Sequence, residues 1–351
     1  MEKLRQEIEK IDRRILNLLK RRFSISKQVG MEKGRLGRAV FDPARESRLI
    51  SGIRSLAKKE GVEFSLVEPV FREIISSSLS IQRKLIISFL GPEATFTHEA
   101  AQKRFGSSVD LLACHTIREA FFAVEKGNAD YGVVPVENSI EGAVSHTLDM
   151  LVETDLHICS QVLIPIHHNL LSAYKESSIK RIYSNPLVFG QCRIFLEENF
   201  PKAELIDVPS TAYAAQIAAK ERDSAAIASL IAAKKYKLKV LRKSIEDSPD
   251  NYTRFLIVGK EMPSRTGKDK TSIVFSVKDE IGALHHMLMP FKRNNINLTK
   301  IESRPSRKKA WDYYFFIDLE GHIQDKPVAG AINDLEKKCN FLKVLGSYPV
   351  E

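Results

Sequence analysis

The hydrophobic pattern of the chain changes near Leu85, and this change constrains the fold more than any other feature of the sequence. Before Leu85, apolar residues recur at alternating steps of four and three, which is the period of packed helices. After it, short apolar runs alternate with amphipathic stretches, as in an α/β protein. The 351 residues leave room for two or three domains. We therefore predict an all-α region followed by an α/β region.

The residues before the change predict three helices. The first carries an apolar seam made of Leu4, Ile8, Ile11, Ile15, Leu18, Arg22, Ile25 and Val29. A charge at Arg22 is costly on such a seam unless it reaches solvent or meets an anion. Lys33 lies on the same face as Arg22, whereas Arg5 points about 100° away. One face of this helix thus carries two cations among apolar residues.

Two further helices have recognisable start signals. Asp42 is a typical amino-terminal cap, and Pro43 suits the first helical position. Ser65 and Glu68 predict a capping box for the third helix. For any one charged residue here, a solvated helical surface is the better interpretation.

Charge is concentrated at the amino terminus. Of the net charge of +10, residues 1–84 carry +9, with 20 Lys and Arg against 11 Asp and Glu. Nucleic acid is the first partner that such a balance suggests, but the segment lacks interleaved aromatic residues and any RNA-binding motif. A small polyanionic ligand remains open.

Two absences limit the class of protein. No run of 18 apolar residues occurs and the amino terminus is charged, so we expect no membrane span, no signal peptide and a cytoplasmic location. Four cysteines lie far apart without a CxxC pair, which argues against a zinc site and a disulfide framework. We expect no metal and no cofactor.

The stretch from Asp130 to Leu151 places polar residues where an α/β sheet binds ligands. An apolar strand runs into a turn with Glu137, Asn138 and Ser139, and a helix follows. Ligands bind at the carboxyl ends of such strands. On this stretch alone, an ordinary turn with a solvated Glu has equal weight.

Free N–H groups that suit carboxylates are expected at four helix starts, near Thr97, Gly142, Leu187 and Ser210.

After a polar linker at residues 264–270, the pattern predicts a third region. Strands are expected over Thr271–Val277, Ile296–Arg304, Trp311–Leu319 and Phe341–Tyr348, with helices over Gly282–Asn294 and Lys326–Cys339. This βαββαβ order is that of a ferredoxin-like domain.

The first region resembles the all-helical chorismate mutases. The match covers residues 4 to 84 through LRQEIEKID (4–12), DPARESRL (42–49) and SxxxQ (78–82). The resemblance implies a substrate site built from Arg5, Arg22, Lys33, Asp42, Arg45, Glu46, Ser78 and Gln82. It also implies that Lys33 and Gln82 hydrogen-bond to the ether oxygen whose bond breaks, and that Glu46 contacts the substrate hydroxyl. It also implies that Arg5 reaches across from a partner subunit.

Residues 87 to 262 resemble prephenate dehydratases, which have two lobes like those of periplasmic binding proteins. GPEATFTHEAA (91–101), VVPVENSIEG (133–142), FGQC (189–192), PSTAYAA (209–215) and DNYTRF (250–255) occur in the family's order. The resemblance makes Thr253 the catalytic hydroxyl. It also implies a binding site lined by Glu137, Asn138, Gln191 and Cys192, with Thr97 and Arg254 as candidates for the substrate carboxylates. His98 is an alternative proton donor, although a structural role is favoured.

The dehydratase resemblance has two departures. Many relatives carry Gly where Ala94 stands and His where Asn185 stands. Ala94 suits the turn only if no positive φ is required there. Asn185 keeps a hydrogen-bonding group but does not titrate.

The third region resembles an ACT domain. GALH (282–285) and ESRP (302–305) match phenylalanine-binding segments, while Ile281 replaces a frequent Pro. The resemblance implies an effector site at an interface of two such domains, formed by Gly282, Ala283, Leu284, Glu302, Ser303, Arg304 and Pro305. A module that only dimerises is the alternative.

Together these resemblances imply a bifunctional enzyme of phenylalanine biosynthesis. It would convert chorismate to prephenate and then to phenylpyruvate, under feedback inhibition by L-phenylalanine, as a homodimer or homotetramer. The expected domains are residues 1–86, 87–263 and 270–351. A catalytically inactive amino-acid sensor is the main alternative, and a nucleic-acid regulator is a distant third.

Overall fold

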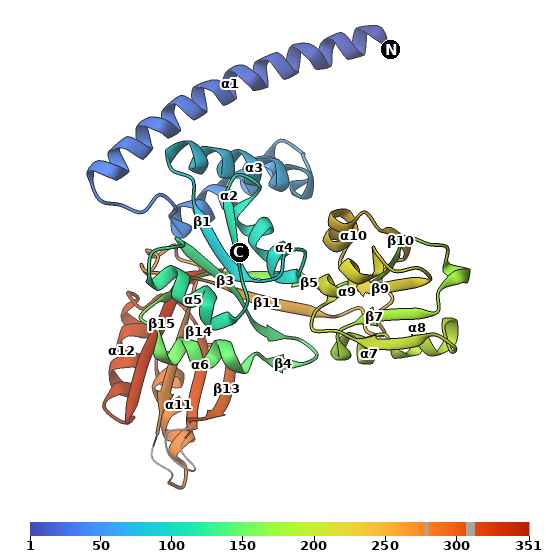
Figure 1. The fold of residues 1–351 in the computed structure, drawn as a ribbon. Coiled ribbons are helices and arrows are strands. Elements are labelled where there is room, and N and C mark those ends of the chain that lie inside the picture. Colours follow the sequence, from blue (N-terminus) through green and yellow to red (C-terminus); the bar gives the residue numbers. More distant parts are fainter. Residues whose placement is uncertain (278–279, 307–312, 351) are drawn as a thin grey trace. The chain divides into compact units, whose positions relative to one another are not determined.

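The structure, a computed structural model, describes residues 1–277, 280–306 and 313–350. It contains two compact units (Figure 1). The first comprises residues 1–86 together with 104–110, and the second comprises residues 87–103 and 111–351. No helix within the described ranges is both long and apolar enough to cross a membrane.

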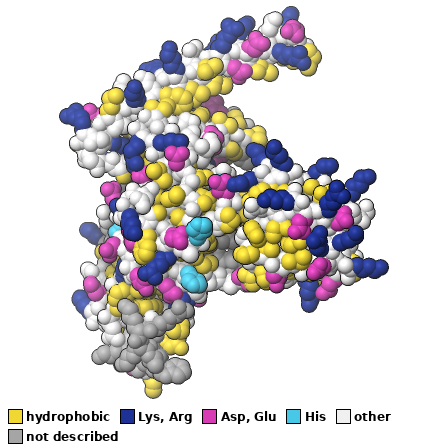
Figure 2. All heavy atoms as spheres, in the orientation of Figure 1, with side chains coloured by type: hydrophobic (Ala, Val, Ile, Leu, Met, Phe, Trp, Pro, Cys, Tyr) yellow, Lys and Arg dark blue, Asp and Glu magenta, His cyan; other side chains and the backbone are white. Residues whose placement is uncertain are grey.

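The first unit is helical, as predicted. It consists of α1 (Glu2–Arg35), α2 (Pro43–Lys59) and α3 (Phe64–Gln82). The predicted apolar seam lies on α1, but it is uncovered, since Leu4 is 60% and Leu18 is 67% exposed. Figure 2 shows apolar side chains in a row along this helix. The carboxyl-terminal part of α1 packs against α3, where Arg22 and Lys33 are half-buried.

One of the two predicted helix starts is confirmed. Asp42 caps α2, with its Oδ1 accepting a hydrogen bond from the Arg45 N–H at 3.0 Å, and Pro43 is the first helical residue. The predicted capping box of α3 is wrong. The N-cap is Glu63 and the helix begins at Phe64, two residues earlier than predicted, so Ser65 lies inside its first turn. Glu68 instead forms an ion pair with Arg72 one turn further on, at 2.6 Å.

The second unit begins with a sheet in the order β2-β1-β3-β11-β5, with β4 beside β3. Its strands are β1 (Ile86–Leu90), β2 (Asp110–Cys114), β3 (Tyr131–Asn138), β4 (Gly142–Ala143), β5 (His157–Pro165) and β11 (Tyr252–Gly259). Its helices are α4 (Phe96–Phe105), α5 (Ile117–Glu125) and α6 (Ser145–Glu153). The last two residues of α4, Arg104 and Phe105, belong to the first unit. Strand β11 lies between β3 and β5 and is antiparallel to both, with Thr253 opposite Asn138. Strand β11, which comes more than 80 residues after β5 in the sequence, thus lies inside the sheet formed by the preceding strands.

A separate sheet has the order β10-β6-β9-β7-β8. Its strands are β6 (Asn169–Ser172), β7 (Arg181–Ser184), β8 (Glu204–Asp207), β9 (Ser224–Ala228) and β10 (Lys239–Arg242). The accompanying helices are α7 (Pro186–Gln191), α8 (Arg193–Asn199), α9 (Thr211–Ala218) and α10 (Leu230–Tyr236), with a 3-10 turn at Glu176–Ser178. Two sheets, each with its own core, confirm the predicted two-lobed architecture.

The third sheet has the order β13-β14-β12-β15 and is antiparallel throughout. It contains β12 (Asp269–Ser276), β13 (Leu298–Pro305), β14 (Tyr313–Glu320) and β15 (Phe341–Pro349), with α11 (Ala283–Arg293) and α12 (Lys326–Glu336). This confirms the predicted ferredoxin-like domain. Trp311, the predicted start of a strand, lies outside the described residues.

Two local expectations are wrong. Ala94 has a φ of 70°, so the turn does adopt the left-handed conformation that favours glycine. The methyl group of Ala94 is nevertheless fully buried in the core of the second lobe. The helix expected near Gly142 begins at Ser145, because Gly142 and Ala143 pair with β3 as strand β4.

Candidate active sites

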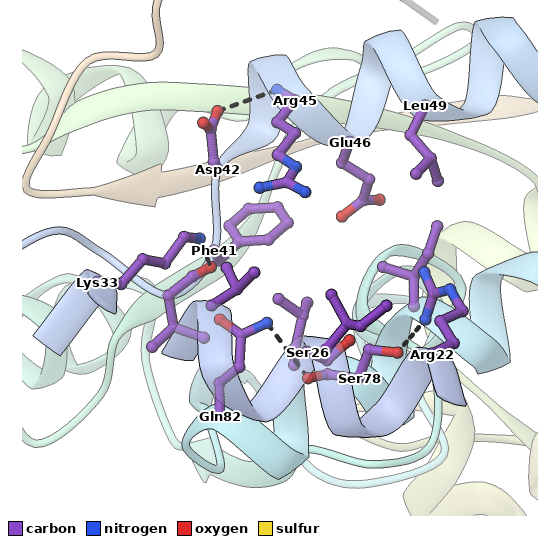
Figure 3. Close-up of a pocket in the computed structure, with 15 residues that line it drawn as sticks. Arg22, Ser26, Lys33, Phe41, Asp42, Arg45, Glu46, Leu49, Ser78 and Gln82 are labelled. Carbon is purple, nitrogen blue, oxygen red and sulfur yellow. Dashed lines mark hydrogen bonds between the residues drawn. The ribbon is translucent and has the colours of Figure 1, made fainter. Parts of the chain in front are cut away.

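The helical unit contains a pocket of roughly 260 Å³ between its three helices (Figure 3). Seven of the eight residues predicted for a mutase site line it, namely Arg22, Lys33, Asp42, Arg45, Glu46, Ser78 and Gln82. Figure 3 shows side chains of α1, α2 and α3 converging on a central space. Because each helix supplies part of the set, the site exists only when all three helices pack together.

Two cations of this pocket are fixed by oxygen atoms. Arg22 donates to the Ile74 carbonyl at 3.2 Å and to the Ser78 hydroxyl, while Lys33 donates to the Val40 carbonyl at 2.5 Å. Burial, followed by the nearby Arg45, lowers the pKa of Arg22. Burial also lowers the pKa of Lys33, and Asp42 partly opposes this effect. Half-buried cations whose charge is disfavoured provide a site for an anion.

Gln82 and Glu46 add hydrogen-bonding groups to the same pocket. Gln82 Nε2 donates to the Ser78 carbonyl at 3.3 Å, whereas its buried Oε1 has no hydrogen-bond partner among the described residues. An unpaired buried amide oxygen is costly and suits a polar ligand. The side chain of Glu46 is nearly buried, at 8% exposure, and lines the pocket opposite α3.

Arg5 is the one predicted mutase residue that does not line this pocket. It lies in the exposed first part of α1, 17 residues before Arg22, a separation of about 25 Å along a helix. The single chain therefore does not bring Arg5 to the other seven residues.

A second polar cluster lies where β3 ends and β11 begins. Asn138 Nδ2 donates to the Thr253 Oγ1 at 2.9 Å and to the Asn251 Oδ1 at 2.8 Å. Since Asn138 donates to Thr253, the hydroxyl hydrogen of Thr253 is free to be donated elsewhere. The carbonyl of Tyr252 also accepts from Asn138 at 3.3 Å, which fixes the amide.

The cluster continues into the second lobe through Gln191. Its Oε1 accepts from Asn251 Nδ2 at 3.0 Å and lies 2.8 Å from His168 Nε2. Its Nε2 donates to the Glu141 carboxylate of the first lobe at 2.9 Å. Burial lowers the pKa of His168, which keeps the ring neutral as a donor to Gln191. Asn251 and His168 were absent from the predicted site, although Asn251 belongs to the DNYTRF motif.

Glu137 and Arg254 extend on the other face of the sheet from Asn138 and Thr253, because strand side chains alternate. The Arg254 guanidinium pairs with Asp318 of β14 and lies 3.7 Å from Glu137, and Lys300 of β13 lies 2.9 Å from Glu137. Burial opposes the charge of Arg254, but Asp318, Tyr348 and Glu137 together outweigh it and raise the pKa of Arg254. The structure therefore separates these two predicted site residues from Thr253.

Three other predicted residues are buried. Cys192 is fully enclosed in an apolar cluster with Leu170 and Leu196, where burial raises the pKa of its thiol. This corrects the expectation that Cys192 lines the site. Thr97 is 5% exposed in the first turn of α4. His98 accepts a hydrogen bond from the Ala94 N–H at 2.8 Å, and burial lowers its pKa, which fits the structural role.

Comparison with known proteins assigns the chain to a family. Family models match residues 4–83 as chorismate mutase type II, residues 87–263 as prephenate dehydratase and residues 271–337 as an ACT domain. A bifunctional chorismate mutase/prephenate dehydratase of Aquifex aeolicus is 48% identical over 99% of this chain and 98% of its own length. The chain belongs to the bifunctional chorismate mutase/prephenate dehydratase family. The Pseudomonas aeruginosa member is 43% identical over 99% of this chain and 96% of its own.

A solved structure supports the dehydratase and ACT parts. The prephenate dehydratase of Arthrobacter aurescens, in complex with L-Phe, is 36% identical and superposes with a TM-score of 0.70. The match covers 76% of this chain and 90% of the other.

The ACT sheet shares a core with the first dehydratase lobe. Phe316 and Leu345 of the ACT sheet pack in one apolar cluster with Val134 and Leu256 of the dehydratase sheet. Lys343 of β15 also donates to the carbonyls of Leu151 and Thr154 at the end of α6. The ACT domain is thus packed directly behind the strand that carries Thr253.

The predicted effector segments lie on two elements of the ACT domain. Gly282 precedes α11 with a φ of 78°, and Ala283 and Leu284 begin this helix. Glu302, Ser303, Arg304 and Pro305 end β13. Arg304 is already paired, since its Nε and Nη2 each donate to the Asp149 carboxylate of α6 at 2.6 Å. In this structure, Arg304 therefore connects the ACT domain to the dehydratase lobe.

Proposed function

We propose that the chain rearranges chorismate to prephenate in its helical pocket and converts prephenate to phenylpyruvate in its two-lobed domain. The observation that carries the first activity is the convergence of seven predicted residues on one pocket. The second rests on the hydroxyl of Thr253, which Asn138 orients at the junction of the two lobes. We propose domain boundaries at residues 1–86, 87–263 and 270–351.

The mutase reaction needs positioning and charge stabilisation rather than a covalent catalyst. Chorismate carries two carboxylates, which suit the guanidinium groups of Arg22 and Arg5. As the ether bond breaks and the new carbon–carbon bond forms, negative charge grows on the ether oxygen. Lys33 and Gln82 would donate to that oxygen, and Glu46 would accept from the substrate hydroxyl. Asp42, Arg45 and Ser78 complete the pocket.

A partner subunit would supply Arg5. The seam of α1 exposes Leu4, Ile8 and Ile11 next to Arg5, and such a surface is stabilised when a second copy covers it. We therefore propose a homodimer, or a homotetramer built from it, in which Arg5 enters the pocket of the other copy. The cytoplasmic location stays a prediction from the sequence.

Gly30 tests the packing that forms the mutase pocket. A Cβ at Gly30 would lie 2.8 Å from the Cβ of Gln82, whereas a Cβ at Gly34 of the same helix meets no atom within 4 Å. Both changes to Ala should favour the helix by about 1 kcal/mol. We expect Gly30→Ala to lower the mutase kcat/KM by about tenfold or more, because Gln82 must move. Gly34→Ala should leave it near the wild-type value, and equal rates in the two variants would contradict the proposed role of Gln82.

The dehydratase reaction needs a proton for a leaving hydroxyl. Prephenate loses carbon dioxide, the electrons of the broken carbon–carbon bond move into the ring, and the hydroxyl departs as water once it is protonated. Thr253 would donate that proton, and the adjacent Asn138 and Gln191 would bind the substrate. Thr97, at the start of α4, stays a candidate for a substrate carboxylate. Glu137 and Arg254, on the opposite face of the sheet, would fix the end of β3 and the start of β11.

An inactive amino-acid sensor explains the site less well. A sensor needs neither an orienting partner for Thr253 nor a pocket with Lys33 and Gln82 beside one another. Incubating the purified chain with chorismate and identifying products by NMR tests the proposal. We expect prephenate first and phenylpyruvate later, and unchanged chorismate would contradict it.

Phenylalanine should inhibit the dehydratase through the ACT domain. Inhibition requires tighter binding to one global state, and a coupling of about 1 to 3 kcal/mol is typical. By linkage, a substrate analogue in the cleft must weaken phenylalanine binding by the same factor. Calorimetry with and without the analogue measures this effect. If the affinity for phenylalanine were the same with and without the analogue, the ACT domain would serve only as a dimerising module.

Removing the ACT domain is a poor test of the same idea. A chain that ends near Met262 would expose Val134 and Leu256 of the shared core and leave Arg254 without Asp318. Breaking one contact is cleaner. Arg304→Met removes the pair with Asp149 and should weaken the inhibition while leaving the uninhibited rate in place.

A further inference from the structure

Glu46 of the helical pocket has a counter-ion from outside the three helices. A carboxylate that is 8% exposed requires a partner. Its Oε1 contacts the guanidinium of Arg104, and Arg72 lies 3.6 Å away. Arg72 is closer to Glu68, at 2.6 Å. Arg104 is therefore the principal counter-ion of Glu46.

Aromatic rings hold the guanidinium of Arg104 in place. Its side chain is 1% exposed. Its central carbon lies 5.0 Å from the ring centre of Phe41 and 5.9 Å from that of Phe105. Phe41 also lines the pocket and directly precedes Asp42. A planar guanidinium stacked on rings loses little further freedom when it binds a carboxylate.

The segment that carries Arg104 is fixed to α3. Gly106 has a φ of 71°, and a Cβ there would lie 2.5 Å from the Cβ of Ser76. Ser107 Oγ donates to the Glu73 carboxylate at 2.6 Å, and the Ser108 N–H donates to Ser76 Oγ at 3.0 Å. These contacts hold the backbone beside Arg104 at a constant distance from the pocket wall.

We propose that Arg104 is a positioning residue of the mutase. It holds Glu46 by Oε1, which leaves Oε2 to accept a hydrogen bond from the substrate hydroxyl. The proposal rests on the mutase function proposed for this pocket. Arg104 lies beyond the mutase match at residues 4–83 and inside the dehydratase match at residues 87–263. The dehydratase sequence would thereby complete the mutase site.

Arg104→Met tests this proposal in the full-length protein. Methionine fills the space between the rings but carries no charge. We expect the mutase kcat/KM to fall by about tenfold to a hundredfold, since Glu46 loses its orientation. Arg104→Lys should restore part of the rate. The matched control is Arg54→Met, because Arg54 also stacks on a ring, 4.6 Å from the centre of Phe64, but does not line the pocket. It should keep the wild-type mutase rate.

A double-variant cycle separates positioning from support of the fold. If Arg104 acts through Glu46, adding Arg104→Met to Glu46→Gln should cost less than about twofold. An equal loss in both backgrounds, or a wild-type rate for Arg104→Met alone, would overturn the proposal. If Arg104→Met does not fold, Arg104→Lys gives the same comparison. Dehydration of supplied prephenate reports on folding throughout, and a wild-type protein inert toward chorismate would instead refute the mutase function itself.

Discussion

Replacing Lys33 with alanine should lower the mutase kcat/KM by about 10²- to 10³-fold, because the lost donor acts on charge that develops only in the transition state. Lys33 is half-buried and held by the Val40 carbonyl, so its ammonium is oriented before the substrate binds. Dehydration of supplied prephenate should be unchanged, since Thr253 belongs to the other unit. Separate assays with chorismate and with prephenate measure the two rates.

Lys27→Ala is the matched control, because Lys27 lies on the same helix, is exposed and does not line the pocket. It should keep the mutase rate. The pH profile gives a second check. The protonated amine of Lys33 is the active form, and burial lowers its pKa. As pH rises, the mutase rate should therefore fall at a lower pH than it would if Lys33 had the pKa of an ordinary lysine. Loss of both activities in Lys33→Ala would show that the two sites are not independent.

Replacing Thr253 with alanine should lower the dehydratase rate by about 10²- to 10⁴-fold, the usual contribution of a positioned proton donor. The change deletes one hydroxyl that accepts from Asn138, so the strand pairing with Ile164 should persist. The mutase rate should stay at its wild-type value. Prephenate consumption followed by absorbance measures the effect.

Thr253→Ser serves as the control for the hydroxyl itself. Serine keeps the oxygen and removes only a methyl group, so a substantial part of the rate should return. If Thr253→Ala turned over prephenate near the wild-type rate, Thr253 would not be the donor. In that case, His168 and Glu141, which reach the same cluster through Gln191, become the next residues to replace.

Sequence patterns were sufficient for elements with strong periodicity or clear caps. The seam of α1, the Asp42 cap and the βαββαβ order were each predicted and found. Strand β9 had no such signal, because Ser224–Ala228 is rich in alanine and fully buried, so neither alternation nor branched residues marks it. Strand β4 was missed because Gly142 and Ala143, which pair with β3, follow a turn and precede a helix, and the sequence reads as if the helix began there.

The candidate sites were predictable as far as local motifs extend. Motifs put Thr253 and Asn138 in one predicted site, and the structure brings the two together because β3 ends where β11 begins. They did not reveal what Arg254 contacts, because its partner Asp318 lies 64 positions later in the chain. Arg104 gave no signal at all, since its partner Glu46 lies 58 positions away in a different family match.

The most direct test of two independent sites in one chain is a mixing experiment. Lys33→Ala alone should leave chorismate unchanged, and Thr253→Ala alone should convert it to prephenate and stop. A mixture of the two purified variants should form phenylpyruvate after a lag, because prephenate released by one protein is dehydrated by the other. Formation of phenylpyruvate by either variant alone, or no phenylpyruvate from the mixture, would contradict the assignment of one activity to each site.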